Sequence, residues 1–155
     1  MKGLGTALVT PFTKEGKVDY ESLGQLIEHQ VAGGTDYLVI LGTTSEVPTL
    51  THKEQDIIIE YVVQKVAGRI PLVLGIGGNS TAAVVERIEE LKEQLVAHFA
   101  AILSVTPYYN RPQQEGLYQH FCAVAEASPV PVILYNVPKR TGVNLLPETT
   151  RRIYD

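Results

Sequence analysis

The chain has 155 residues, of which 45% are hydrophobic and 19% charged, and its formal net charge at pH 7 is −4. A chain of this length can bury one full core, so we predict a single domain over residues 1–155. The acidic balance excludes the basic field that nucleic-acid binding needs, and no apolar run is long enough to span a membrane. With Cys122 as the one cysteine, no internal disulfide is expected, which is typical of a cytoplasmic protein.

Helices are expected where capping signals precede apolar residues at helical spacing. Thr51 and Glu54 have the spacing of a capping box, in which the two side chains satisfy backbone N–H groups at the start of a helix. Asp19 is a candidate N-cap of an earlier helix. The expected helices run, in chain order, from Asp19 to Gly33, from Thr51 to about Ala67, from Ser80 or Thr81 to Leu95, from about Glu115 to Ala127, and from Pro147 onward.

Apolar runs alternate with these helices. They begin near residues 6, 37, 71, 100 and 131, so they recur at intervals of about 30 residues. A run that is apolar throughout, such as residues 37–41, is typical of a parallel strand covered on both faces. The pattern therefore predicts a βα repeat with a parallel sheet.

Two α/β architectures fit this repeat. A (β/α)8 barrel, or TIM barrel, has the same rhythm but needs roughly 250 residues, so this chain would provide five of its eight units. A five-stranded open sheet of the flavodoxin type fits the length with no unit missing. The length favours the open sheet, whereas the residues at the strand ends favour the partial barrel.

Polar side chains gather where the expected strands stop. The carboxyl ends of parallel strands meet at one edge of a sheet, so these side chains are expected to face a common pocket. Neighbouring hydroxyls can relay a proton, and a guanidinium presents a planar fork that suits a carboxylate. Taken singly, the threonines could cap turns and the tyrosines could pack at strand ends. Taken together they indicate a small keto-acid substrate, and the candidates are Thr43, Thr44, Tyr108, Tyr109, Tyr135 and Arg140.

Neither a cofactor nor a metal ion is expected. Residues 75–79 follow a strand and precede a helix, as a dinucleotide-binding loop does, but Ser80 stands where the third glycine of that motif would be. The four histidines are scattered along the chain without the spacing of metal ligands. We therefore predict no nucleotide site and no metal site.

Long motifs stand at Gly42 to Glu46, at Val105 to Pro112 with Gln114 to Phe121, and at Leu134 to Pro138 with Arg140 to Gly142. These segments resemble the dihydrodipicolinate synthase family, now called 4-hydroxy-tetrahydrodipicolinate synthase. The resemblance covers nearly the whole chain. The wider family includes N-acetylneuraminate lyase, but the adjacent tyrosines and the position of Arg140 are similar to the synthase branch.

The resemblance implies a (β/α)8 barrel that condenses pyruvate with aspartate semialdehyde through a Schiff base on a lysine, a step of lysine biosynthesis. By position, it implies that Thr43, Tyr109 and Tyr135 form a proton relay in which Tyr109 reaches into a neighbouring subunit. It also implies that Thr44 holds the carboxylate of pyruvate and that Arg140 receives the carboxylate of the semialdehyde.

The Schiff-base lysine of the family has no expected counterpart here. In the family it lies on the sixth strand, and the sequence stops at Asp155, before that strand would begin. None of the lysines lies in an expected buried strand, where desolvation would favour a neutral amine. We therefore expect the 155-residue chain to be inactive alone. The alternative is an engineered or truncated α/β scaffold without catalysis, and open strand edges lead us to expect self-association in either case.

Overall fold

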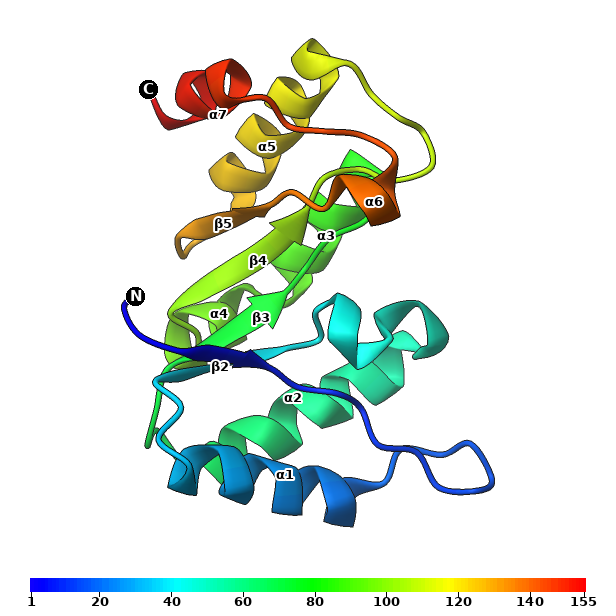
Figure 1. Ribbon diagram of the computed structural model, residues 1–155, viewed down its shortest axis with the longest axis vertical. Helices are drawn as coiled ribbons and strands as arrows, with labels where there is room; N and C mark the ends of the chain where they lie inside the picture. The colour runs from blue at the N-terminus through cyan, green and yellow to red at the C-terminus, as the bar shows by residue number, and fades with distance from the viewer. The chain divides into compact units, whose positions relative to one another are not determined.

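The computed structural model describes residues 1–155, which form two compact units, Met1–Gly75 and Ile76–Asp155. In each unit, helices pack against short strands (Figure 1). The elements of the first unit are β1 (Gly5–Ala7), α1 (Tyr20–Ala32), β2 (Tyr37–Ile40), the 3₁₀ turns η1 (Thr43–Ser45) and η2 (Val47–Thr49), α2 (His52–Val66) and β3 (Leu72–Gly75). Those of the second unit are α3 (Thr81–Glu90), α4 (Lys92–His98), β4 (Ala101–Val105), α5 (Gln114–Ala127), β5 (Val132–Tyr135), α6 (Pro138–Thr141) and α7 (Pro147–Tyr154).

β2 is the middle strand of the first unit. It pairs in parallel with β1, where Thr6 lies opposite Leu38, and in parallel with β3, where Val39 lies opposite Val73. A flavodoxin-type sheet would place the first strand between the second and the third. The open-sheet alternative is therefore wrong, because the strands follow one another in sequence order as successive units of a (β/α)8 barrel do.

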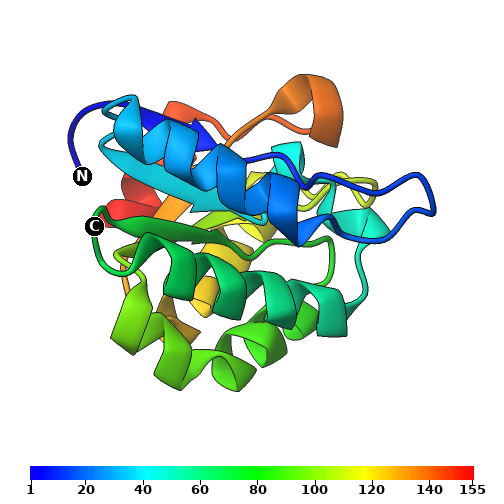
Figure 2. The same cartoon turned by 90° about the horizontal axis from the view of Figure 1, so that it is seen from below.

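α1 and α2 pack side by side in the first unit, and Figure 2 views them from the helix side. Their starts are those expected from the sequence. Asp19 accepts a hydrogen bond from the backbone N–H of Ser22 at 3.0 Å, and Thr51 and Glu54 form a capping box. The backbone N–H donors at these two helix starts lower the pKa of Asp19 and of Glu54.

β4 and β5 pair in parallel in the second unit, with Ser104 opposite Leu134. Leu134 packs against the apolar core of this unit, which α5 supplies together with the segment before α7. α5 therefore covers the face of the strands that carries Ser104 and Leu134, and α7 packs beside α5 (Figure 1). The buried residues of this core are Leu117, Phe121 and Leu145.

The third expected helix is interrupted. Instead of one helix that runs to Leu95, α3 ends at Glu90 and α4 begins at Lys92. Leu91 between them has φ −96° and ψ 6°, although it is buried like Leu95. Neither glycine nor proline marks the break, and nothing in the structure explains it.

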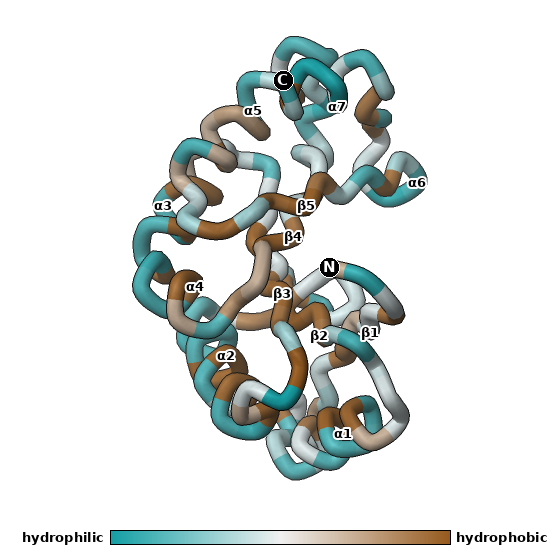
Figure 3. Tube along the Cα trace, turned by 90° about the vertical axis from the view of Figure 1, so that its left-hand side faces the viewer, coloured by the Kyte–Doolittle hydropathy of each residue, from teal (hydrophilic) through white to brown (hydrophobic).

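Hydropathy follows the division into strands and helices. Figure 3 shows that β2 to β5 are the most continuous hydrophobic stretches of the tube, whereas the helices alternate between polar and apolar positions. This alternation is expected of helices that have one face toward a core and one toward water. No helix combines the length and the hydropathy that crossing a membrane requires.

Candidate functional site

The predicted site residues divide between the two units. Thr43 and Thr44 belong to the first unit, and Tyr109, Tyr135 and Arg140 belong to the second. Each of them lies at or just after the carboxyl end of a strand: the threonines after β2, Tyr109 after β4, and the other two at the end of β5 and beyond it. Contacts within each unit show how its own residues are held.

Thr43 and Thr44 open η1 directly after β2, and both side chains are exposed. The turn is bracketed by two non-glycine residues in the left-handed backbone region, Leu41 with φ 52° and Glu46 with φ 56°. Such a conformation costs roughly 1–2 kcal/mol per residue, so it persists only where surrounding contacts enforce it. The backbone that carries the two threonine hydroxyls is thus held on an unusual path.

Two buried hydroxyls fasten this turn to the segment that follows β1. Ser45 Oγ donates to the carbonyl of Leu8 at 2.7 Å, and Thr10 Oγ1 donates to the carbonyl of Ser45 at 2.8 Å. Both hydroxyl-bearing residues are buried. Ser45 and Thr10 therefore act as positioning residues for the turn, while the hydroxyls of Thr43 and Thr44 stay open to a ligand.

Tyr135 ends β5 and is fixed through its backbone. It lies opposite Val105 of β4, and the N–H of Thr106 donates to its carbonyl at 3.1 Å. Leu134 packs against the α5 core, and successive side chains of a strand point to opposite faces. The half-buried phenol of Tyr135 therefore projects from the face that α5 leaves uncovered.

The loop after β4 presents Tyr109 to solvent. The side chain is 87% exposed, and its backbone φ of 68° lies in the left-handed region. Asn110 anchors the loop, because its Nδ2 donates to the carbonyl of Asn79 at 2.7 Å and its backbone N–H donates to the carbonyl of Tyr108 at 2.8 Å. The Tyr109 phenol is held out from the second unit rather than packed against it.

Arg140 lies exposed on the short helix α6, which continues the chain beyond β5. Asn136 closes this segment into a loop: its Nδ2 donates to Asn144 Oδ1 at 2.8 Å, and its Oδ1 accepts from the N–H of Leu145 at 3.0 Å. Gln114 of α5 donates to the carbonyl of Asn144 at 2.8 Å. These amide side chains hold both ends of the segment that carries the Arg140 guanidinium.

Arg111 is a second guanidinium at this segment, and it is not among the site residues predicted from the sequence. Its φ is 49°, and its Nε lies 3.0 Å from the point where a Cβ on Gly142 would stand. Gly142 is the left-handed C-cap of α6, with φ 73°. Arg111 therefore lies against the end of the helix that carries Arg140. A cation two residues after a pair of adjacent tyrosines was the sequence signal that could have indicated it.

The lysine side chains of the chain are all exposed. Lys139, the one nearest to Tyr135 and Arg140 in sequence, lies exposed on α6. Amine nucleophiles that work at neutral pH are normally activated by burial. These residues therefore contain no desolvated amine. The seven lysines are Lys2, Lys14, Lys17, Lys53, Lys65, Lys92 and Lys139.

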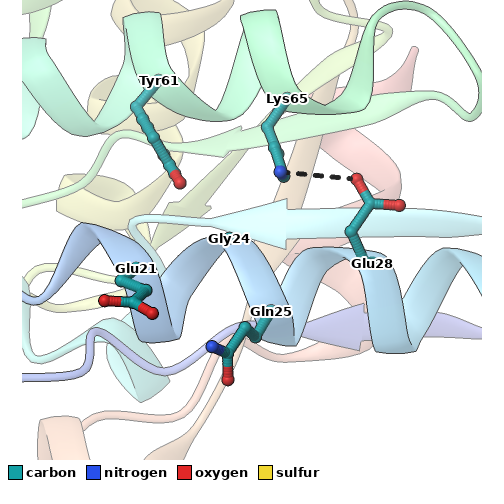
Figure 4. A pocket seen from close by; sticks show the side chains of 6 residues that line it. All are labelled: Glu21, Gly24, Gln25, Glu28, Tyr61 and Lys65. Carbon is teal, nitrogen blue, oxygen red and sulfur yellow. Dashed lines mark ion pairs between the residues drawn. The ribbon is translucent and has the colours of Figure 1, made fainter.

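Neither the surface groove of the first unit nor an acidic cluster adds a ligand site. The groove lies between α1 and α2 and has a volume of about 420 Å³ (Figure 4). Its Glu28 carboxylate lies 4.0 Å from Lys65 and accepts two hydrogen bonds of 2.8 Å from Arg69, which lower the pKa of Glu28. Arg69 and Lys65 thus neutralise the negative charge of Glu28 within the protein. No group of three or more His, Cys, Asp or Glu side chains is arranged to hold a metal ion.

Comparison with known proteins places the whole chain in one family. The model of the Dihydrodipicolinate synthetase family matches residues 1–155. The chain belongs to the dihydrodipicolinate synthetase family. A 4-hydroxy-tetrahydrodipicolinate synthase of Parabacteroides distasonis is 58% identical over 153 residues, which cover 99% of this chain and 50% of that protein. One of Geotalea daltonii is 57% identical over 152 residues, which cover 98% of this chain and 51% of that protein.

Solved structures of the dihydrodipicolinate synthetase family share the fold. The dihydrodipicolinate synthase of Aquifex aeolicus matches with a TM-score of 0.91 at 45% identity, over 99% of this chain and 51% of that one. The chloride-inhibited enzyme of Acinetobacter baumannii, complexed with pyruvate, matches with a TM-score of 0.93 at 44% identity, over 99% and 52%. The chain spans about half the length of the relatives it matches. The partial-barrel prediction and the family resemblance are both confirmed.

Proposed function

We propose that residues 1–155 form the proton-transfer and carboxylate-binding part of a 4-hydroxy-tetrahydrodipicolinate synthase. Such an enzyme condenses pyruvate with aspartate semialdehyde, a lyase-type reaction of lysine biosynthesis. The observation that carries the proposal is the end of β5, where Tyr135 projects from the face that α5 leaves uncovered and Arg140 follows on the exposed α6. In (β/α)8 barrels, catalytic groups come from the carboxyl ends of the strands. The names of the relatives support the same reaction.

Thr43, Tyr109 and Tyr135 are the proposed proton relay. Each has a hydroxyl that can donate and accept a hydrogen bond, so a proton can pass along them when they come within hydrogen-bonding distance. Tyr135 is half-buried, which suits the member that exchanges a proton with the bound keto acid. Tyr109 is 87% exposed, which suits a side chain that serves a second copy of the chain.

Thr44 and Arg140 are the proposed partners of the substrate carboxylates. The exposed hydroxyl of Thr44 stands at the start of η1 and donates to the carboxylate of pyruvate. The planar fork of Arg140 binds the carboxylate of the semialdehyde through two parallel N–H donors. Arg111 lies against the C-cap of α6 and adds positive charge to the same segment.

The lysine that forms the imine is proposed to lie outside residues 1–155. Its amine attacks the keto carbon of pyruvate, the C–N bond forms, and the carbonyl oxygen leaves as water. The exposure of every lysine in these residues argues against each of them in this role. A polypeptide of residues 1–155 alone is therefore expected to show no turnover.

Self-association is the second part of the proposal. β1 pairs only with β2, and β5 pairs only with β4, so both strands have an unpaired edge. Unpaired edges of parallel strands recruit further strands unless something covers them. For a polypeptide of residues 1–155 alone, a second copy of the chain is the proposed partner, and the 87% exposed side chain of Tyr109 is available to contact it.

A chimera tests the proposed function. Residues 1–155 replace the corresponding half of the Parabacteroides distasonis relative, to which they are 58% identical. We expect turnover of pyruvate with aspartate semialdehyde, and the unaltered relative is the control for the assay. A chimera with the circular dichroism and native mass of the relative but without turnover would contradict the proposal and favour the non-catalytic scaffold.

A further inference from the structure

Gln114 is the first residue of α5, and its half-buried side-chain amide makes three hydrogen bonds to one later stretch of the chain. Its Nε2 donates to the carbonyl of Asn144 at 2.8 Å. Its Oε1 accepts from the backbone N–H of Leu146 at 3.1 Å and from Oγ1 of Thr149 at 2.6 Å. These partners lie between 30 and 35 residues away in sequence, so the amide joins two separate segments of the second unit.

The two ends of this amide act on different elements. The oxygen accepts both of its bonds from the start of α7, because Leu146 is the N-cap of that helix and Thr149 lies in its first turn. The nitrogen bonds to Asn144, which lies between Gly142, the C-cap of α6, and the start of α7. Oε1 therefore fastens α7, whereas Nε2 fastens the chain that returns from α6.

Asn144 connects this link to the end of β5. Its Oδ1 accepts a hydrogen bond of 2.8 Å from Nδ2 of Asn136, the residue directly after Tyr135. The side chains of Asn136 and Asn144 thus close the α6 segment at its base, and Gln114 ties that base to α5. Arg140 lies within the closed segment. Figure 1 shows the chain leaving β5 through α6 and returning to α7 beside α5.

The hydrogen bonds inside the segment are local. Thr141 Oγ1 donates to the carbonyl of Val143 at 2.9 Å, and the N–H of Gly142 donates to the carbonyl of Pro138 at 2.9 Å. These bonds shape α6 but do not orient it on the unit. Val143 packs against the apolar core, but apolar contact is not directional. The bond from Gln114 Nε2 to Asn144 is directional and comes from a long helix, so it orients the segment.

We propose that Gln114 is a positioning residue for Arg140 and thereby sets the affinity for the carboxylate of the second substrate. The inference rests on the proposed function, in which Arg140 binds the carboxylate of aspartate semialdehyde. The carboxylate of pyruvate is assigned there to Thr44, which belongs to the first unit. Gln114 should therefore affect the binding of the semialdehyde and leave that of pyruvate unchanged.

Gln114→Glu separates the two functions of the amide, because it replaces one NH2 group by an oxygen atom. The carboxylate of the variant can still accept from Leu146 and Thr149, so α7 stays fastened. It cannot donate to Asn144, and it places a negative charge against that carbonyl oxygen instead. The variant thus releases the return from α6 alone.

Steady-state kinetics of the chimera test the proposal. In Gln114→Glu the KM for aspartate semialdehyde should rise about fivefold to tenfold, the factor expected for one lost hydrogen bond, while the KM for pyruvate keeps the parent value. Gln113→Glu adds the same charge one residue earlier, at an exposed position without a side-chain cap bond, and should keep both constants. An unchanged KM for the semialdehyde in the folded Gln114→Glu chimera would overturn the proposal, as would an equal rise for both substrates.

Thr149→Val distinguishes positioning from general loosening. It removes the hydroxyl that donates to Gln114 Oε1 and leaves the bond from Nε2 to Asn144 in place. The variant should lower the free energy of unfolding and keep the parent KM for the semialdehyde. A KM that rises as much in Thr149→Val as in Gln114→Glu would overturn the proposal.

Backbone dynamics test the same link without any turnover. In the 155-residue polypeptide, the ¹⁵N order parameters of residues 137–144 should be about 0.85 in the parent and in Gln113→Glu. They should fall toward about 0.6 in Gln114→Glu. Order parameters that keep the parent values in Gln114→Glu would overturn the proposal. If the parent chimera shows no turnover but the order parameters fall as expected, the proposed function fails and the link from Gln114 to the α6 segment is supported.

Discussion

Left-handed backbone at non-glycine residues marks both parts of the candidate site. Leu41 and Glu46 bracket the turn after β2, and Tyr109 and Arg111 flank the anchoring Asn110 in the loop after β4. Such residues cluster at functional loops because the rest of the fold sustains their cost. Four of the five non-glycine residues with positive φ therefore lie in the same two loops that the strand-end chemistry indicates, and the fifth, Ala67, is the C-cap of α2.

The phenol of Tyr135 is predicted to matter for proton transfer rather than for binding. In the chimera, Tyr135→Phe should lower kcat by about 10²–10³-fold, because positioned acid–base groups contribute about 10²–10⁴-fold. The KM for pyruvate should change little, since Thr44 remains. Steady-state kinetics check this, with Tyr118→Phe on α5 as a control that retains kcat. A Tyr135→Phe chimera with the parent kcat would remove Tyr135 from the relay.

Gly75 is predicted to be required for the approach of β3 to the end of β2. A Cβ at this position would lie 2.1 Å from the carbonyl oxygen of Leu41, and backbone cannot yield as a flexible side chain can. Gly75→Ala should therefore lower the free energy of unfolding by on the order of 3 kcal/mol. Urea unfolding measures this cost.

Gly16→Ala is the matched control for Gly75→Ala. Gly16 has φ 77°, but nothing lies within 4 Å of its would-be Cβ, so the variant isolates backbone strain. Its expected cost is about 1 kcal/mol. If the two variants lower the free energy of unfolding by the same amount, the close approach of Gly75 to Leu41 does not determine the cost of a side chain at position 75.

At the scale of elements, short sequence motifs predicted the features that depend on contacts between neighbouring residues, such as helix caps. The Asp19 cap and the Thr51–Glu54 capping box are confirmed, because each involves residues within one helical turn. The anchors of the site were not predictable in this way. Asn136 and Gln114 act through bonds to residues 8 and 30 positions away, for which short-range patterns carry no signal.

The packing of α5 on α3 is predicted to make stability depend on pH. Burial lowers the pKa of His120 below its ordinary value of 6.5, so the folded chain binds this proton less readily than the unfolded chain. The contribution of neutral His120 to the free energy of unfolding should therefore be complete above pH 6.5. It should fall as the pH drops below 6.5, and no further loss is expected below the folded pKa.

Urea unfolding between about pH 8 and pH 5 measures this dependence on His120. The difference in slope between the parent and His120→Gln isolates the contribution from that of the carboxylates. His98→Gln, at an exposed position, is the matched control and should keep the parent slope. Identical slopes for the parent and His120→Gln would contradict the prediction.

At the scale of the molecule, periodicity alone could not choose between the two sheet architectures. A barrel and an open sheet give the same βα rhythm of about 30 residues. The choice depends on which strands pair, and the pairing of β2 with β3 decides it, because a flavodoxin-type sheet would place β1 between them. The residues at the strand ends favoured the barrel, which is correct. The length favoured the open sheet, which is wrong, because the chain matches only about half the length of a relative.

Self-association is the prediction that belongs to this scale. The unpaired edges of β1 and β5 and the exposed Tyr109 lead us to expect a dimer or larger assembly of the 17.0 kDa chain. Light scattering on the purified polypeptide measures its native mass. A mass of 17.0 kDa at every concentration would contradict the expectation.

Borohydride trapping with pyruvate, followed by peptide mass mapping, tests most directly whether residues 1–155 supply the relay but not the nucleophile. We expect no adduct on the 155-residue polypeptide. In the chimera we expect one adduct per chain, on a lysine outside residues 1–155. A reduced pyruvate adduct on any of the seven lysines of these residues would contradict the division of roles.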